Sequence, residues 1–387
     1  MWMTLVFLAL AYRLWIMALS LLTIMASCCK EPFKLLAGYQ IHHQYTFVFP
    51  VYREQKIILD TLKYYEIFLS NTANIDLVFV TSRKETGELT TLGLITAYWQ
   101  GSQYQNRVTV LTCPALEGTK ATQINYALEH LRTVLATRRI VSFDCDARIS
   151  YEDFCAAEHW IGDHYDAVVY SFVPRSHLSQ VSGFFVRSIV MHSLERSLAL
   201  EYSSSQLRMV HSSYPMGATM LLMPAIWQKI DRLPEPIDDI SLQYILRFYA
   251  LKMRSLPYFT DVQPPPDTKN LFRQIVPIFK GVFSVGSTAQ YYKQKFPVPY
   301  RLVSLLRYGY YLLEPLGILL ALTGQWWLLI CFGMQILLDS WWSRNFTPIN
   351  IAAHGFGYLI RLAQFCYFLV RVLFQPPQLH QFKTDRS

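Results

Sequence analysis

Charged residues are scarce in this sequence. Asp, Glu, Lys and Arg make up 16% of the 387 residues, whereas a soluble domain carries about 25%. Hydrophobic residues make up 52%, and the scarcity of charge is concentrated near the two ends. We therefore predict a soluble central domain between membrane-embedded flanks, because the length accommodates one domain of more than about 200 residues with additional helices.

Three further patterns are absent, and each absence excludes a class of protein. The seven cysteines include no Cys-x-x-Cys pair and no Cys/His spacing typical of zinc, and their odd number argues against a disulfide framework. A reducing compartment is the simplest interpretation. No Gly-x-Gly-x-x-Gly follows the first predicted strand, which disfavours a dinucleotide-binding fold. The net charge of +8 comes without a basic patch interleaved with aromatics, so we expect no nucleic-acid partner.

Apolar segments at both ends predict helices in or on a membrane. Residues 2–29 are apolar apart from Arg13 and a few small polar groups, which predicts one helix that spans the bilayer or lies deep in its interface. Lys30 and Lys34 follow this segment and place its C-terminal end on the cytoplasmic side. Towards the C-terminus we expect an interfacial amphipathic helix at 270–283, a helical hairpin at 302–322 and 325–342, and a last apolar helix at 349–374.

Between these flanks, strand-like and helix-like patterns alternate. Apolar runs of strand length occur at 45–50, 75–80, 108–112, 140–143 and 167–173, and helical periodicity occurs at 55–69, 90–100, 121–135, 183–200 and 240–252. Such alternation predicts an α/β domain with a parallel, doubly wound sheet. The predicted division is 1–40 for a membrane helix and linker, 41–268 for the α/β domain, 269–300 for interfacial helices, 301–375 for membrane helices and 376–387 for a tail.

Two aspartates follow the strand expected at 140–143. Asp144 and Asp146 are separated by one residue, and in an extended chain such side chains point the same way. Two carboxylates can therefore hold one hard cation that bridges to phosphates. The carboxyl end of a strand is also where ligands bind in open α/β sheets. Because Asp-x-Asp is a common pattern, two solvated loop aspartates are the alternative interpretation.

Five motifs in a fixed order carry a resemblance to a known family. They are Phe49-Pro50-Val51-Tyr52-Arg53-Glu54, Gly118-Thr119-Lys120 with Asn125-Tyr126-Ala127, Asp144-Cys145-Asp146, Gly217-Ala218-Thr219, and Asp238-Asp239-Ile240-Ser241-Leu242. Together they resemble the membrane-associated family 2 glycosyltransferases, an inverting, nucleotide-sugar-using group that includes the cellulose and hyaluronan synthases. The resemblance covers about residues 45–285. It implies the GT-A fold, a Rossmann-like domain with a mostly parallel mixed sheet.

The resemblance also implies roles for individual residues. It assigns Asp146 and Asp144 to a divalent cation, Mg²⁺ or Mn²⁺, which neutralises charge on the leaving diphosphate. It makes Asp239 the general base that takes the proton from the acceptor hydroxyl, with Asp238 as the alternative. The residues implied to bind the nucleotide sugar are Pro50, Tyr52, Glu54, Glu85, Lys120, Asn125 and Asp144.

Structural interpretations stand beside these roles. Lys120 also suits a solvated helix start, and Asn125 suits a buried polar position. The carboxylates of Glu54, Asp238 and Asp239 suit helix N-termini, where they complement the helix dipole.

The sequence departs from the family pattern at two places. The aspartate that usually ends the second strand is missing, and Glu85 is the nearest acidic substitute, so the identity of the nucleotide is open. The Gln-x-x-Arg-Trp motif of processive synthases is also missing: in the corresponding stretch, 273–281, only Gln274 and Gly281 fit.

The expected activity is metal-dependent, inverting transfer of a sugar from a nucleotide-sugar donor. The acceptor is expected to be lipid-linked or a membrane-proximal glycan, as in cell-surface glycan synthesis, with the catalytic domain on the cytoplasmic side and in contact with membrane lipids. A processive polysaccharide synthase and a non-catalytic membrane scaffold are the alternatives. The missing Gln-x-x-Arg-Trp and the small number of helices favour single transfer over polymerisation. The presence of Asp144, Asp146 and Asp239 favours an enzyme over a scaffold.

Overall fold

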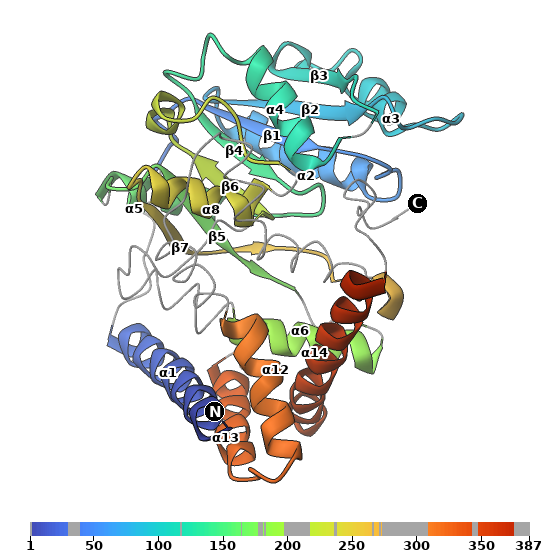
Figure 1. Cartoon of the computed structure of the whole chain (residues 1–387). Coiled ribbons are helices and arrows are strands. Elements are labelled where there is room, and N and C mark those ends of the chain that lie inside the picture. The colour runs from blue at the N-terminus through green and yellow to red at the C-terminus, as the bar shows by residue number, and fades with distance from the viewer. Residues whose placement is uncertain are drawn as a thin grey trace.

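The computed structural model contains an α/β domain and a separate group of helices. It describes residues 2–29, 39–116, 118–163, 165–176, 181, 183–196, 217–235, 238–264, 267–270, 272, 309–342 and 347–374. The α/β domain and the helical group lie one above the other in Figure 1. Most of the interfacial helix expected at 270–283, the first residues of the expected hairpin and the basic tail lie outside the described residues.

A seven-stranded mixed sheet forms the centre of the α/β domain. Its strands, in the order β3-β2-β1-β4-β6-β5-β7, are β1 (Tyr45–Pro50), β2 (Ile75–Ser82), β3 (Val108–Cys113), β4 (Arg139–Phe143), β5 (Val169–Arg175), β6 (Thr219–Leu222) and β7 (Met253–Asp261). Strand β6 runs antiparallel to both of its neighbours, and the other pairs are parallel. The expected α/β class with a mostly parallel mixed sheet is therefore confirmed.

The strand order reverses direction next to β1. The chain places β2 and β3 on one side of β1 and β4 on the other, with β1 parallel to both β2 and β4. In open α/β sheets such a switch point leaves a crevice outside the carboxyl ends of the strands, where ligands bind. The segments that follow β1 and β4 are therefore the first place to look for a site.

Helices cover both faces of the sheet. They are α2 (Ile58–Asn71), α3 (Thr91–Trp99), α4 (Lys120–His130), α5 (Tyr151–Asp163) and α8 (Asp238–Phe248). Alternate side chains of β1 enter two different cores, because successive residues of a strand point to opposite faces. Val48 belongs to a core shared with α4 and α8, whereas Phe47 and Phe49 belong to one shared with α2, α3 and α5.

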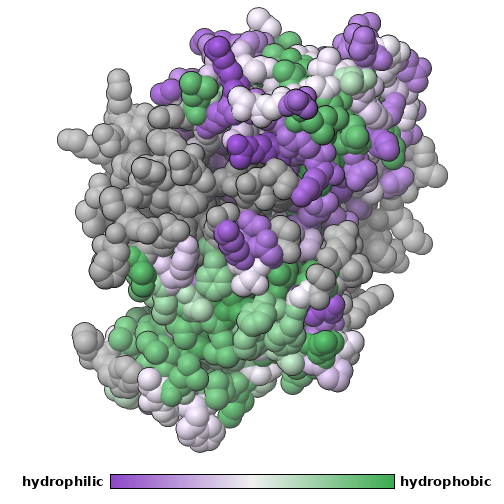
Figure 2. Space-filling model, turned by 90° about the vertical axis from the view of Figure 1, so that its right-hand side faces the viewer, coloured by the Kyte–Doolittle hydropathy of each residue, from purple (hydrophilic) through white to green (hydrophobic). Residues whose placement is uncertain are grey.

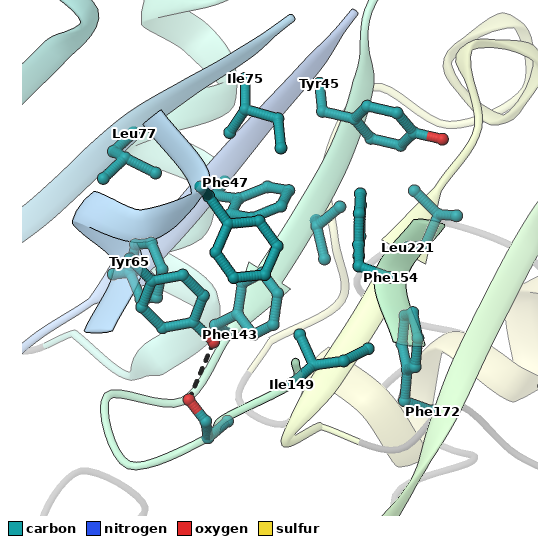
Figure 3. Packing of buried hydrophobic residues seen from close by; sticks show 14 of the residues in the cluster. Tyr45, Phe47, Tyr65, Ile75, Leu77, Phe143, Ile149, Phe154, Phe172 and Leu221 are labelled. Atoms are coloured by element: carbon teal, nitrogen blue, oxygen red, sulfur yellow. Dashed lines mark hydrogen bonds between the residues drawn. The ribbon is translucent and has the colours of Figure 1, made fainter. Parts of the chain in front are cut away.

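The second core is rich in aromatic rings. Phe47 lies at its centre, with ring centroids 5.0 Å from Phe143 and 5.1 Å from Phe154 (Figure 3). Phe143 is the last residue of β4 and therefore directly precedes Asp144. Because aromatic pairs of this kind bury large apolar areas, they fix the end of β4 against α2 and α5.

Strand β7 was not anticipated from the sequence. The segment contains Arg254 and Pro257, which are unusual in a strand, and the helix expected at 240–252 ends earlier, at Phe248. Strand β7 lies at the edge of the described sheet, where proline is tolerated because no described strand pairs with its outer side. Arg254 pairs with Asp166, which gives the charged side chain a partner beside the strand.

Five of the described helices form the helical group. They are α1 (Trp2–Cys29), α6 (Phe184–Arg196), α12 (Gly309–Leu322), α13 (Leu328–Trp342) and α14 (Pro348–Phe374), and they lie together in the lower part of Figure 1. Helix α6 packs closely against α14: a side chain at Gly357 would place its Cβ 2.7 Å from Cβ of His192. Among the described helices, only α1 combines the length and apolar character needed to cross a bilayer, over Met3–Leu22.

Polar side chains are buried inside this helical group. Arg13 is only 1% exposed, and its guanidinium lies over the rings of Phe332 and Tyr358, at 4.1 and 4.8 Å from their centroids. Nε2 of His192 in α6 lies 2.8 Å from Oε1 of Glu314 in α12, and both side chains are buried. These contacts join α1, α6, α12, α13 and α14 through specific polar partners as well as apolar packing.

Candidate functional site

Hydrogen bonds from α2 and from Arg148 hold the loop that follows β4. Thr61 donates a hydrogen bond to the carbonyl of Cys145 (2.8 Å), and the Tyr65 hydroxyl donates to the carbonyl of Ala147 (2.9 Å), the bond drawn as a dashed line in Figure 3. Arg148 donates to both of the same carbonyls, at 2.7 and 2.8 Å. The Cys145 side chain is buried. Four donated bonds therefore fix the conformation of the segment that contains Asp144 and Asp146.

Asp146 is a buried carboxylate anchored to the far side of the sheet. Its side chain is 6% exposed and accepts a hydrogen bond of 3.1 Å from the backbone N–H of Gln263, just after β7. The backbone of Arg148 pairs with that of Asp261 on the same stretch. The interpretation of Asp146 as a solvated loop residue therefore does not hold.

Lys120 joins the two acidic motifs. It is the first residue of α4, whose N-terminus is closed by a capping box between Thr119 and Thr122. Its Nζ lies 2.8 Å from Oδ1 of Asp144 and 3.8 Å from Oδ2 of Asp238. Burial alone lowers the pKa of Lys120, but the nearby carboxylates outweigh that effect and raise the pKa overall. Lys120 is therefore charged and paired with carboxylates, and its side chain is only 19% exposed.

Asp238 and Asp239 occupy the first turn of α8. Asp238 is 5% exposed, and Asp239 Oδ2 accepts a hydrogen bond of 3.0 Å from the backbone N–H of Gly217. Burial raises the pKa of Asp238, Lys120 opposes that rise, and Asp144 adds to it. Lys120 also donates to the carbonyl of Gly217. The structure thus brings together Lys120, Asp144, Asp238 and Asp239 at one place.

The raised pKa of Asp238 predicts a pH-dependent contribution to stability. The unfolded chain loses this proton near pH 4, whereas the folded chain keeps it to higher pH. The contribution of Asp238 to the free energy of unfolding is therefore fully present below the pKa of the unfolded chain. It is lost as the pH rises through the higher pKa of the folded chain. We expect Asp238→Asn to remove that loss, so that the variant gains free energy of unfolding relative to wild type as the pH rises from about 4. Urea unfolding at a series of pH values measures this, and a pH-independent difference would contradict it.

The residues expected around the nucleobase lie after β1 and β2. Tyr52 has the guanidinium of Arg53 over its ring, 5.3 Å from the centroid, and Pro50 ends β1. Glu54 is 5% exposed, and its backbone N–H donates to Thr91 Oγ1 (3.1 Å). These residues stand at the carboxyl edge of the sheet, on the β2 side of the switch point.

Glu85 fastens the loop after β2 to its surroundings. It accepts hydrogen bonds from the backbone N–H and the hydroxyl of Thr91 (2.7 and 2.8 Å), at the start of α3, and from Gln55 Nε2 (2.6 Å). The carboxylate thereby connects the segment after β1 with the N-terminus of α3. Glu85 lies beside residues 53–55 and therefore borders the predicted nucleobase region. Its hydrogen bonds also stabilise that region.

Asn125 is engaged with the segment that precedes α8. Its amide exchanges two hydrogen bonds with the backbone of Leu233 (2.7 and 3.0 Å) and donates to Glu235 Oε1 (3.2 Å). Glu235 also accepts from Thr122 Oγ1 (2.8 Å). Asn125 therefore holds α4 against the segment before α8, and within the described part of the chain its bonds go to Leu233 and Glu235 rather than to Asp144 or Asp238.

Two contributors were not singled out from the sequence. Gln123 is 6% exposed and donates to the carbonyls of Val51 (2.9 Å) and Val80 (2.7 Å), which ties together the ends of β1 and β2. Arg148 orders the loop after β4, as described above. A glutamine on the inner side of α4 was a detectable signal, because a buried amide requires polar partners.

A groove of about 670 Å³ runs along α4 but does not include the acidic cluster. Its lining includes Thr122, Asn125, Trp227 and Glu235. Glu235, one of the lining residues, precedes Asp238 at the start of α8 by three positions in the sequence. The chemistry is therefore better judged from the charged side chains at the sheet edge than from this groove.

The acidic side chains suit a hard divalent cation. Asp144, Asp146 and Asp238 offer carboxylate oxygens, the ligands that Mg²⁺ and Mn²⁺ prefer, and Oδ2 of Asp238 is buried without a hydrogen-bond partner among the described residues. The described residues contain no cluster of three or more His, Cys, Asp or Glu side chains arranged around one metal position. A cation at this edge would therefore rely on phosphate or water oxygens to complete its coordination, as Mg²⁺ commonly does.

Comparison with solved structures identifies the fold. A mannosyltransferase from Pyrobaculum calidifontis, PcManGT, superposes with a TM-score of 0.55 at 15% identity, over 96% of this chain and 100% of that one. This is a glycosyltransferase fold. Residues 1–349 of Staphylococcus aureus TarS match less well, with a TM-score of 0.39 at 13% identity over 86% of this chain and 92% of that one. No family model and no curated protein sequence matches the chain.

Proposed function

We propose that this chain is an inverting family 2 glycosyltransferase that moves a sugar from a nucleotide-sugar donor to an acceptor at a membrane. The observation that carries the proposal is the convergence of Asp144 and Asp238 on the ammonium group of Lys120, at the carboxyl edge of the sheet. The three residues belong to different elements, and local structure alone does not require them to meet. A buried cation among carboxylates at a switch point suits a sugar diphosphate and its metal ion.

The donor side of the proposed site consists of Lys120, Asp144 and Asp146. The two aspartates would hold Mg²⁺ or Mn²⁺, which, when bound, neutralises charge on the leaving diphosphate. Lys120 stands at the N-terminus of α4, where backbone N–H groups and the helix dipole also favour phosphate. PcManGT was solved with GDP-Man and Mn²⁺, and a nucleotide-sugar donor with a divalent cation is the pair we propose here.

The acceptor side consists of Asp239, with Asp238 beside it. Asp239 is proposed to take the proton from the attacking acceptor hydroxyl. A single displacement assisted by one base inverts the anomeric centre, by analogy with inverting glycosidases. The Gly217 N–H that holds Asp239 Oδ2 at 3.0 Å fixes the position of this carboxylate relative to the strand β6.

Membrane association is part of the proposal and is supported by the surface of the helical group. Large apolar side chains stand exposed on α1, α12, α13 and α14, for example Phe7 (67%), Leu322 (61%) and Trp341 (58%). Figure 2 shows apolar residues gathered over the part of the molecule opposite the sheet domain, whose own visible surface is mainly polar. An apolar patch of this extent suits lipid. We place the α/β domain on the cytoplasmic side, following Lys30 and Lys34.

Two alternatives remain outside this proposal. A processive synthase is disfavoured by the missing Gln-x-x-Arg-Trp, although that stretch lies outside the described residues. A non-catalytic scaffold is disfavoured because a partly buried Lys120 placed between Asp144 and the buried Asp238 contributes little to stability, and such clusters of charge are typical of functional sites.

Incubation of membranes that contain the chain with a panel of radiolabelled nucleotide sugars and Mn²⁺ tests the proposal. Separation of the products by size distinguishes the three classes. We expect one labelled, single-sugar product from one donor, absent from membranes without the chain. A long labelled polymer would establish the processive alternative, and absence of any product over the whole panel would favour the scaffold.

A further inference from the structure

The backbone of Gly217 makes hydrogen bonds on both sides of its Cα atom. Its N–H donates to Oδ2 of Asp239 at 3.0 Å, and the carbonyl of the same residue accepts a hydrogen bond from Lys120. Lys120 is in turn paired with Asp144 at 2.8 Å. A single residue without a side chain thus connects the lysine of the proposed donor side with the carboxylate of the proposed acceptor side.

A side chain at position 217 would collide with Asp239. A Cβ added to Gly217 would stand 2.6 Å from Oδ2 and 3.1 Å from Cγ of that aspartate. The backbone at Gly217 is not in the positive-φ region, unlike Gly87 and Gly101. Glycine is therefore needed here for the close approach of the carboxylate and not for an unusual backbone conformation.

The neighbouring residues fix Gly217 relative to the Asp144 loop. The backbone N–H of Asp144 donates to the carbonyl of Ala218 at 2.8 Å, and Thr219 pairs with Phe143 in the antiparallel ladder between β6 and β4. Gly217 therefore cannot shift independently of the residues that precede Asp144. The sheet therefore fixes the position of the Gly217 backbone and of the carboxylate that it binds.

We infer that Gly217 is a positioning residue for the base. It aims the carboxylate of Asp239 through its N–H, leaves the space that the carboxylate occupies, and is itself held by Lys120. This inference rests on the proposed function, in which Asp239 accepts the acceptor's proton. The inference adds that the orientation of Asp239 depends on Gly217, whose carbonyl accepts a hydrogen bond from Lys120 of the donor side.

Gly217→Ala tests the inference directly. The methyl group displaces the carboxylate of Asp239, and a displacement of about 1 Å at a reacting group can cost about 100-fold in rate. We expect kcat to fall by about 10- to 100-fold, with the Kd for the nucleoside diphosphate in the presence of Mn²⁺ unchanged. Gly162→Ala in α5 is the matched control, because nothing lies within 4 Å of its added Cβ, and it should leave kcat unchanged. A normal kcat for Gly217→Ala would overturn the inference.

A double-variant cycle separates positioning from a general structural effect. If Gly217 acts through Asp239, Gly217→Ala should cause little further loss of kcat in the Asp239→Asn background. Full additivity would show that Gly217 matters for another reason and would overturn the inference. Retained activity in Asp239→Asn alone would instead refute the base assignment of the proposed function, so the two failures are distinguishable.

Hydrogen exchange provides a test that does not depend on the folding of Gly217→Ala. The Gly217 amide should exchange faster in Asp239→Ala than in wild type, because its acceptor is removed. Amides of α5 provide the internal reference and should exchange at equal rates in both proteins. Equal protection of the Gly217 amide in the two proteins would overturn the inference.

Discussion

Asp239→Asn is expected to lower the rate of sugar transfer by about 100- to 10,000-fold, the usual contribution of a positioned general base. The amide keeps an oxygen that can accept the hydrogen bond from Gly217, so the first turn of α8 should retain its structure. An amide does not take up the proton of an attacking hydroxyl. The loss should therefore fall on kcat, because Asp239 does not belong to the groups proposed to bind the nucleotide.

The measurement combines initial rates with equilibrium binding of the nucleoside diphosphate. Binding should match wild type within about twofold, the usual precision of such comparisons. Asp60→Asn is the matched control, because Asp60 is also an acidic residue in the first turn of a helix, α2, and is exposed. It should change the rate little, since an exposed first-turn carboxylate contributes about 0.3–1 kcal/mol to helix stability. Near-normal turnover in Asp239→Asn would end its assignment as the base.

The strands at the centre of the sheet were predictable because burial on both faces leaves a simple signal. Strands β1 and β4 are buried along their whole length, so each reads as a short apolar run. Strand β7 was missed because it lies at the edge, where Arg254 and Pro257 are tolerated and the apolar signal is weakened. The antiparallel direction of β6 was not predictable either, because the direction of a strand depends on the path of the chain between strands and not on strand composition.

The sequence suggests which residue types form the candidate site, but it does not predict their contacts. Periodicity places Asp144 and Asp146 at a strand end, but it does not place Lys120 beside Asp144 or Gly217 beside Asp239. Those two contacts join residues 24 and 22 positions apart along the chain, and they form only once the sheet has formed. Asn125 is a further contact that the sequence did not predict. Its amide was expected near the sugar, and the structure shows its hydrogen bonds directed to Leu233 and Glu235.

Lys120 also affects how the proposed metal site would bind a cation. Its ammonium group lies 2.8 Å from Asp144 and neutralises part of the carboxylate charge that a divalent cation would meet. A diphosphate supplies both a partner for the lysine and oxygen ligands for the cation. Metal and nucleotide are therefore expected to bind more tightly together than either does alone, a reciprocal coupling between the two ligands.

Removal of divalent metal is expected to reduce transfer by at least about 100-fold, since neutralisation of the leaving diphosphate is the main role of the cation. Activity measured in excess EDTA should recover when Mn²⁺ or Mg²⁺ is restored. Asp146→Asn should raise the Mn²⁺ concentration for half-maximal activity by about 10-fold or more, because a neutral amide is a weaker ligand for a hard cation. The amide oxygen can still accept the bond from Gln263, so the loop after β4 should remain folded.

Two comparisons make the Asp146→Asn result specific. Asp60→Asn carries the same substitution away from the sheet edge and should show the wild-type dependence on Mn²⁺. Thermal unfolding without metal should be similar in wild type and Asp146→Asn, because the four bonds from Thr61, Tyr65 and Arg148 that hold the loop are unaffected. Full activity in EDTA, or an unchanged Mn²⁺ requirement in Asp146→Asn, would contradict a metal held by this loop. It would leave the buried charge of Lys120 as the group that faces the leaving diphosphate.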